Sequence, residues 1–299
     1  MASPTHAAAR ARDDAAGQSH LMRSLRVFVR TPANIVSALV ILAGVAMVFV
    51  PTAWLPHDPT RIDILNRLQG PSWSLSEGYF FGTDALGRDV LSRVVFAARW
   101  TFLVSASAAA LACVIGSLAG LVAGYFGGHV DGVISRLIDM QLAFPVILLA
   151  LSVLAVAGPS LTNMILVLVL VDWARYARVV RSAAIAQRTN AYVEAAAALG
   201  ASHPRIMLTH LLPNLASTVL VMATFSTSLL LLTESALSFL GLGVSPPAVT
   251  WGGMIGAGRD YIYAAWWVAS IPGIVITSMV LAINWIGDGL RDAFDPRER

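Results

Sequence analysis

Apolar residues in this chain come in long blocks rather than at the spacing of amphipathic helices. Charged residues are nearly absent from residues 31–57, 100–130, 140–171, 206–233, 235–258 and 261–287. A helix needs about 20 mostly apolar residues to cross the hydrocarbon core of a bilayer. The pattern predicts an all-α integral membrane protein. The charged fraction of 12% agrees, because it is about half that of a soluble domain.

The 140–171 block is too long for one helix and contains a turn signal, AGPSL, at residues 157–161. Gly and Pro interrupt regular structure, so the block is expected to form two helices, the second continuing past Asp172. We predict six transmembrane helices, at about 33–54, 101–125, 140–157, 161–178, 215–240 and 265–287.

The basic residues predict the orientation of these helices. All 20 are Arg, and cytoplasmic loops of membrane proteins retain an excess of basic residues. With the N-terminus inside, 14 of the 20 fall on the cytoplasmic side, and five of the other six lie in one outer loop. Both termini are therefore expected in the cytoplasm.

The predicted organisation follows from these helices and their orientation. The apolar run after the polar first 32 residues is longer than that of a signal peptide, so it is interpreted as a retained transmembrane helix. The segments are a cytoplasmic tail (1–32), the first transmembrane helix (33–54), an extracytoplasmic loop (55–99), a transmembrane core (100–289) with a cytoplasmic loop (179–213), and a cytoplasmic tail (290–299).

The cytoplasmic loop at 179–213 reads as helix–turn–helix. Ala191–Leu199 is a strong helix former, and Gly200 is suited to end it in the left-handed conformation. Ser202 can cap a second short helix with Pro204 in its first turn, and Pro213 is expected to mark its end. The apolar face is mostly Ala, which gives little membrane affinity. Docking into a groove of another protein is therefore favoured over a connector lying on the bilayer.

This loop resembles a cytoplasmic motif of the permease subunits of ATP-binding-cassette (ABC) importers: Glu-Ala-Ala, three residues, Gly, nine residues, Ile-x-Leu-Pro. The residues at the matching positions are Glu194, Ala195, Ala196, Gly200, His210, Leu212 and Pro213. His210 replaces the Ile, a change typical of the peptide-importer branch. In that family this element is the coupling helix, which docks in a cleft of the ATPase subunit.

Four further stretches resemble the second, C-type inner-membrane subunit of the dipeptide/oligopeptide (peptide/nickel) family: 81–99, 124–145, 234–254 and 287–297. The resemblance implies the type I ABC importer permease fold, with residues 100–289 as its core, in a bacterial inner membrane. It also implies a second homologous permease, two ABC ATPase subunits and an extracytoplasmic substrate-binding protein as partners. The implied cargo is a dipeptide or oligopeptide, with nickel or glutathione import as alternatives.

The 81–99 stretch has a structural interpretation as well. It reads as an amphipathic surface helix with Asp84 as a possible cap. Its Arg side chains are expected either to be solvated or to contact the external binding protein.

Ionisable groups inside a membrane are costly, so each is a functional candidate. Asp172 lies about 16 Å into its predicted helix at 1.5 Å per residue, and Arg175, three residues on, is a possible ion-pair partner. Glu234 falls near the outer end of the fifth helix, where it either lines the translocation path or bonds to a neighbouring helix. Asn163 and Asn284 are further candidates for the path.

Gly116, Gly120 and Gly124 form a small-xxx-small ridge that lets another helix approach closely. That helix belongs either to this chain or to another subunit. The single cysteine, Cys113, permits no disulfide within the chain and is interpreted as a packed residue.

Several function classes are excluded by residue type. A P-loop needs Lys, and the chain has none, so ATP and Mg are expected in the partner ATPase subunits, with no cofactor in this chain. No H-E-x-x-H or G-x-S-x-G occurs and the six His are scattered, so neither an enzyme nor a metal site is expected. No nucleic-acid partner is expected. An ion-coupled secondary transporter is the remaining rival, but Asp172 has no midplane counterpart in another half of the chain.

Overall fold

The computed structural model describes residues 32–74 and 78–294. Of the two predicted tails, 1–32 and 290–299, residues 1–31 and 295–299 lie outside the described residues. The described part is helical and has no strand, with one isolated bridge between Thr83 and Asp89. Its α-helices are α2 (Pro32–Phe49), α3 (Val90–Phe126), α4 (Gly128–Ala143), α5 (Val146–Ala157), α6 (Leu161–Gln187), α7 (Ala191–Ala198), α8 (His203–Arg205), α9 (Leu212–Phe239), α10 (Trp251–Gly258) and α11 (Trp267–Phe294).

Four helices in the described ranges are long and apolar enough to cross a membrane: α2, α3, the continuous helix His203–Phe239, and α11. The α4–α5 pair adds a fifth if its two bent halves count as one span. α6 has 27 residues, about 40 Å at 1.5 Å per residue. It falls outside this set because its first 18 residues contain three charges, Asp172, Arg175 and Arg178.

The prediction of one helix over 140–157 is wrong. α4 ends at Ala143 and α5 begins at Val146, with a bend of 89° between them. Phe144 is extended, with φ −85° and ψ 137°. A proline disfavours helical geometry in the residue before it, so Pro145 accounts for the break at this position.

The second membrane helix is longer than predicted. α3 begins at Val90 rather than near residue 101 and runs for 37 residues, about 55 Å. Asp89 is its N-cap, because the Asp89 carboxylate accepts a hydrogen bond from the Ser92 N–H at 3.0 Å. The helix therefore extends well beyond the hydrocarbon core of a bilayer.

The expectation that Asp84 caps a surface helix over 81–99 is also wrong. Asp84 Oδ1 accepts from the backbone N–H of Arg88 at 3.0 Å, within a turn that precedes α3. Its Oδ2 pairs with Arg88 Nε at 2.8 Å and lies 3.5 Å from Arg93 Nε. Arg93 also donates to the Pro59 carbonyl at 3.2 Å. These two Arg side chains therefore hold together the segment between α2 and α3 instead of being free in solvent.

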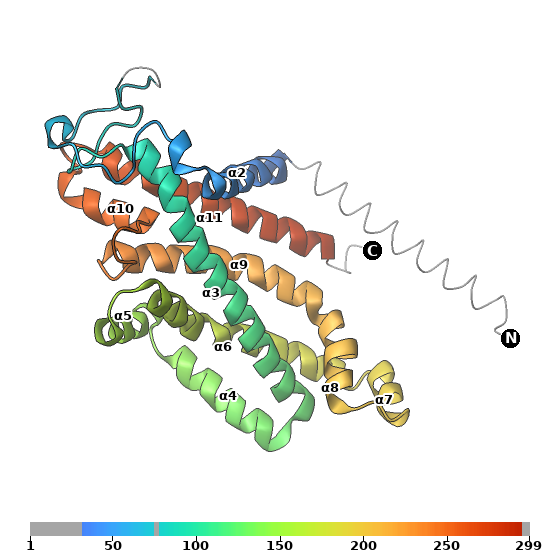
Figure 1. The fold of residues 1–299 in the computed structure, drawn as a ribbon. Helices are drawn as coiled ribbons and strands as arrows, with labels where there is room; N and C mark the ends of the chain where they lie inside the picture. Colours follow the sequence, from blue (N-terminus) through green and yellow to red (C-terminus); the bar gives the residue numbers. More distant parts are fainter. Residues whose placement is uncertain (1–31, 75–77, 295–299) are drawn as a thin grey trace.

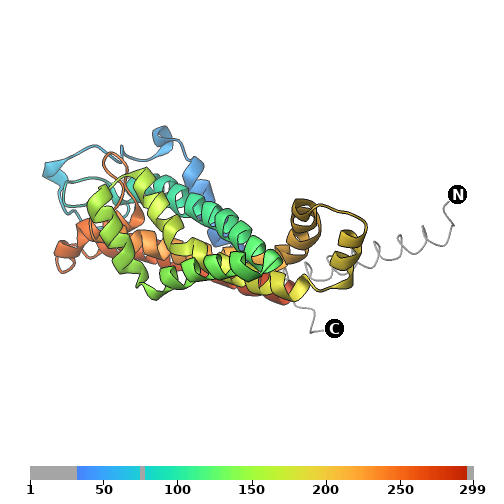
Figure 2. The same ribbon diagram turned by 90° about the horizontal axis from the view of Figure 1, so that it is seen from below.

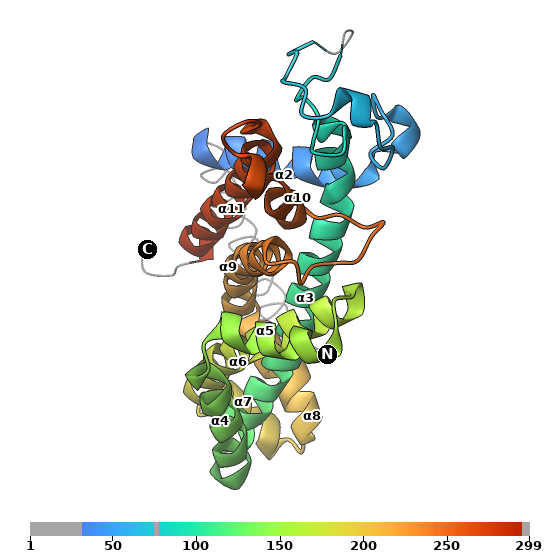
Figure 3. The ribbon, with the colours of Figure 1, turned by 90° about the vertical axis from the view of Figure 1, so that its left-hand side faces the viewer.

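α3 runs along most of the molecule (Figure 1) and contacts α2, α4, α6, α9 and α10. α9 lies between one group, formed by α2, α10 and α11, and another, formed by α4, α5 and α6 (Figure 3). The loops between α2 and α3 occupy one end of the molecule, and α7 and α8 project from the other end (Figures 1 and 2).

The glycine ridge of α3 packs against α6 of the same chain. A Cβ atom placed on Gly116 would lie 2.3 Å from the Trp173 carbonyl oxygen, and one on Gly120 would lie 2.4 Å from that of Ala177. At Gly124 the nearest backbone atom, the Arg181 carbonyl oxygen, would be 2.7 Å away. The backbones of α3 and α6 are therefore in direct contact, as small residues permit in membrane helices.

Two buried Trp side chains fix α10 and α11 at the end of the molecule that carries the loops between α2 and α3. Trp251 Nε1 donates to the Val94 carbonyl of α3 at 2.9 Å, and Trp267 Nε1 donates to the Thr83 carbonyl at 3.0 Å. The Trp251 ring also packs edge-on against Phe102 of α3. These bonds satisfy the indole N–H groups inside an otherwise apolar cluster.

Candidate docking site

The predicted helix at 191–199 is confirmed as α7, and so is its left-handed end. Gly200 has φ +79°. Its N–H donates to the Ala197 carbonyl at 3.0 Å, and the Ala201 N–H donates to the Ala196 carbonyl at 3.0 Å, which is the Schellman pattern. A Cβ atom on Gly200 would meet nothing within 4 Å. The requirement for glycine is therefore conformational rather than steric.

The second helix of the predicted pair is not separate from the fifth span. α8 passes through a π-helical turn, η3 (Ile206–Leu211), directly into α9, so Pro213 does not end a helix. A proline cannot donate to the carbonyl four residues earlier, and the π turn lies directly before α9, which has Pro213 in its first turn. Ser202 precedes α8 but makes no capping hydrogen bond with its side chain.

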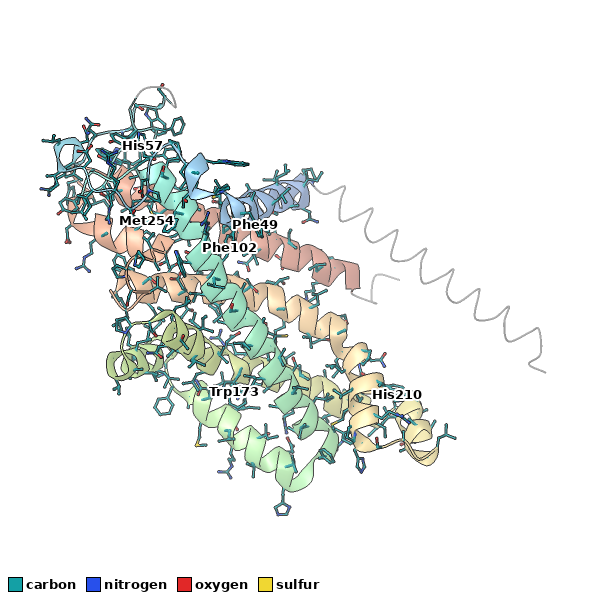
Figure 4. All side chains as sticks on the ribbon, viewed as in Figure 1. Phe49, His57, Phe102, Trp173, His210 and Met254 are labelled. Carbon is teal, nitrogen blue, oxygen red and sulfur yellow. The ribbon has the colours of Figure 1, made fainter. Side chains whose placement is uncertain are left out.

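The motif residues divide between a tip and a stem. Glu194, Ala195 and Gly200 are exposed at the tip, and Ala196 is half-buried beside them. His210, Leu212 and Pro213 lie on the stem formed by η3 and the start of α9. Figure 4 places His210 at this end of the molecule and His57 at the opposite end.

An apolar cluster anchors this segment to the long helices α3, α6 and α9. It contains Leu121, Val180, Ala184, Val193, Ile206, Leu211 and Leu215. Outside the cluster, Leu199 at the tip leaves 89% of its surface exposed. The segment is therefore held in one orientation while its tip presents an apolar and an acidic residue to the surroundings.

An open pocket of about 440 Å³ lies where the segment meets the bundle. Its lining residues are Tyr125, Phe126, Arg188, Thr189, Val193, Glu194, Ala197 and His203. Tyr125 Oη lies 2.8 Å from His203 Nδ1, and Arg188 Nη1 donates to the Gly124 carbonyl at 3.2 Å. Tyr125, Arg188 and His203 were missed by the sequence interpretation, because no local pattern indicates that α3 ends beside α8.

Asp172 and Arg175, the charges predicted to lie within the membrane, form an ion pair, and the carboxylate of this pair is enclosed by the chain. Asp172 is fully buried, and its Oδ1 lies 3.5 Å from Arg175 Nη1. The Ser226 hydroxyl of α9 donates to Asp172 Oδ2. The carboxylate therefore links α6 to α9 and is balanced by an Arg that is 31% exposed.

The remaining polar candidates are engaged locally. Glu234 is fully buried and accepts hydrogen bonds from the hydroxyls of Ser238 at 2.6 Å and Ser235 at 3.4 Å, on the same helix. Asn163 Nδ2 donates to the Ala157 carbonyl at 2.9 Å and so closes the α5–α6 turn.

Asn284 Oδ1 of α11 accepts from the Ser228 hydroxyl of α9 at 2.7 Å. Within the described residues, no hydrogen bond or ion pair joins Asp172, Glu234 and Asn163 to one another. No group of three or more His, Cys, Asp or Glu side chains is arranged there to hold a metal ion.

Comparison with known proteins relates the chain to transport components. Residues 116–299 match the family described as "Binding-protein-dependent transport system inner membrane component". That range includes the whole 191–213 segment.

Among curated relatives, the di/tripeptide transport system permease protein DppC of Pseudomonas aeruginosa is 41% identical over 81% of this chain and 80% of its own length. The dipeptide transport system permease protein DppC of Alkalihalophilus pseudofirmus is 39% identical over 88% and 84%. The probable D,D-dipeptide transport system permease protein DdpC of Escherichia coli is 36% identical over 89% and 88%.

Among solved structures, an inward-facing MetNI methionine ABC transporter contains a chain of similar fold. The TM-score is 0.54 and the sequence identity 20%, and the match covers 69% of this chain and 97% of that one.

Proposed function

Because the chain belongs to the family of binding-protein-dependent transport system inner membrane components, we propose that it is the permease subunit of an ATP-driven peptide importer whose 191–213 segment docks on an ATPase subunit. We call residues 191–213 the coupling segment. The observation that carries the proposal is the projection of α7 and α8 from one end of the bundle, with Glu194 and Leu199 exposed at the tip.

The proposed topology has six spans with both termini in the cytoplasm. The spans are α2, α3, the bent α4–α5 pair, α6, the helix leading into α9, and α11. The Asp172–Arg175 pair supports α6 as a span, because the two charges balance each other inside the chain. Arg188 precedes the coupling segment and Arg205 lies within it, which supports a cytoplasmic location for the segment.

The proposed ATPase subunits and binding protein would contact opposite ends of the molecule. A second homologous permease would complete the pathway, and two ATPase subunits, which bind ATP and Mg, would take the coupling segments. An extracytoplasmic binding protein would deliver cargo to the loops between α2 and α3, which lie at the end of the molecule opposite the coupling segment (Figure 1). The names of the relatives support dipeptides or oligopeptides as the cargo.

The proposed mechanism is alternating access. ATP binding closes the ATPase pair, the coupling segments move with it, and the spans reorient around a central cavity. Such a cycle needs two global states that differ in affinity for ATP. The chain itself contributes mechanical coupling rather than catalysis.

Gentle detergent purification from the native host, followed by mass spectrometry, tests the proposal. We expect a second permease of this family and P-loop ATPases to co-purify, and the binding protein recovered with them would identify the cargo. A chain recovered alone, under conditions that preserve other membrane complexes, would favour a self-sufficient transporter instead.

A further inference from the structure

Three membrane helices reach the coupling segment, but only two of them are joined to it by the main chain. α6 leads into α7 through residues 188–190, and η3 leads from α8 into α9. α3 ends beside the segment at Phe126 without a covalent link to it. A displacement of α8 can therefore reach α3 directly only through side chains.

Tyr125 and His203 provide that direct contact. The Tyr125 hydroxyl lies 2.8 Å from His203 Nδ1, and the two ring centroids are 5.6 Å apart. The Phe126 ring contacts the same imidazole with a centroid distance of 5.6 Å. His203 is the first residue of α8, so the last two residues of α3 hold the start of that helix.

The contact lines an open pocket of about 440 Å³ instead of a packed core. In a close-packed core, many neighbouring atoms share the transmission of a displacement. Leu121 of α3 also packs with Ile206 and Leu211 of η3 in the apolar cluster, whereas the Tyr125–His203 contact joins α3 to the start of α8 through a polar pair of side chains.

α3 in turn is packed closely against α6. The Gly120 position of α3 lies against the Ala177 backbone of α6. Arg188, at the α6–α7 corner, donates to the Gly124 carbonyl of α3 at 3.2 Å. A force applied to the end of α3 therefore acts on the α3–α6 pair as a unit, and α6 contains the buried Asp172 that bonds to α9.

We propose that the Tyr125–His203 contact transmits the displacement of the coupling segment to the α3–α6 pair, which makes Tyr125 and His203 positioning residues for transport. This inference rests on the proposed importer function. It predicts that the contact affects the coupling between ATP hydrolysis and uptake more than it affects assembly or hydrolysis itself.

The test uses the complete complex in proteoliposomes, with uptake and ATP hydrolysis measured in the same preparation. Tyr125→Phe removes only the hydroxyl. Loss of one neutral hydrogen bond is expected to lower uptake per ATP roughly threefold to tenfold. Basal hydrolysis and the amount of co-purified ATPase should remain close to wild type. His203→Ala, made from the other side of the contact, should give the same effect.

Ser182→Ala is the matched control. It removes one hydroxyl from α6, outside the coupling segment, whose hydrogen bond goes to the Arg178 carbonyl at 3.0 Å, four residues earlier in the same helix. That bond does not reach α3 or α8, so the ratio of uptake to hydrolysis should stay near wild type. The double variant Tyr125→Phe/His203→Ala should be no worse than His203→Ala alone, because both changes break one contact.

Three results would overturn the inference: an unchanged ratio in Tyr125→Phe, an equal loss in Ser182→Ala, or a parallel loss of uptake and hydrolysis with less bound ATPase. The last result would assign the contact to docking. A wild-type complex without ATP-driven uptake would reject the proposed function itself, whereas normal variants in an active complex would reject only the role of this contact.

Discussion

The close approach of α3 and α6 predicts that even a methyl group at Gly120 destabilises the protein. A Cβ atom there would lie 2.4 Å from the Ala177 carbonyl oxygen and 2.9 Å from the Arg181 nitrogen. Both are backbone atoms, which cannot rotate away. The two helices would have to separate by about 1 Å to restore ordinary van der Waals contact.

The magnitude follows from two opposing effects. Overpacking costs up to about 3 kcal/mol when the neighbours cannot yield, whereas Gly to Ala within a helix gains about 1 kcal/mol. Gly120→Ala is therefore expected to lose about 2 kcal/mol of unfolding free energy. Gly132→Ala in α4 is the matched control, because its new Cβ meets nothing within 4 Å and only the gain remains.

The assay is unfolding of the purified protein in mixed detergent micelles, followed by the fluorescence of its Trp residues. The predicted difference between the two variants is about 3 kcal/mol, with Gly132→Ala the more stable. Equal stability of Gly120→Ala and Gly132→Ala would refute the reasoning, since it would mean that α3 and α6 do not touch through their backbones.

Three further substitutions test other parts of the account. Gly200→Val strains a position with φ +79° by about 1–2 kcal/mol, so uptake per ATP should fall while the level in the membrane, measured by immunoblot, stays unchanged; normal uptake would contradict this. Arg175→Gln leaves Asp172 buried without a counter-charge and should cost about 2–3 kcal/mol in the same unfolding assay, less than for a fully buried pair because Arg175 is partly exposed. The double variant with Asp172→Asn should recover most of this loss; if it is as unstable as Arg175→Gln alone, the two side chains do not act as a pair. Asp89→Ala removes the N-cap of α3 and should cost about 1 kcal/mol, whereas Asp89→Ser should keep most of the stability.

The sequence was most informative where local chemistry decides the structure. Helix propensity and a glycine with positive φ are properties of a few consecutive residues, so α7 and its end at Gly200 were predicted correctly. The break between α4 and α5 was also signalled locally, by Pro145, but the continuous apolar run around it outweighed that signal. The start of α3 was misplaced because Arg93 and Arg99 suggested a surface segment.

Contacts between distant segments could not be predicted in the same way. The glycine ridge indicated close helix packing, but only the fold identifies α6 as its partner. The Tyr125–His203 contact joins residues 78 apart, and neither residue belongs to the motif that marks the coupling segment. The hydrogen bond from Ser226 to Asp172 likewise depends on how α9 packs against α6.

ATP-driven accumulation in a defined system tests the central claim most directly. Proteoliposomes would contain this chain, its sister permease and the ATPase subunits, with ATP inside and the binding protein loaded with a labelled dipeptide outside, so that the ATPases facing the lumen have access to ATP. The account predicts accumulation that requires ATP and is lost when the coupling segment is replaced by a flexible linker. Accumulation that follows an ion gradient without ATP, or that survives this replacement, would contradict it.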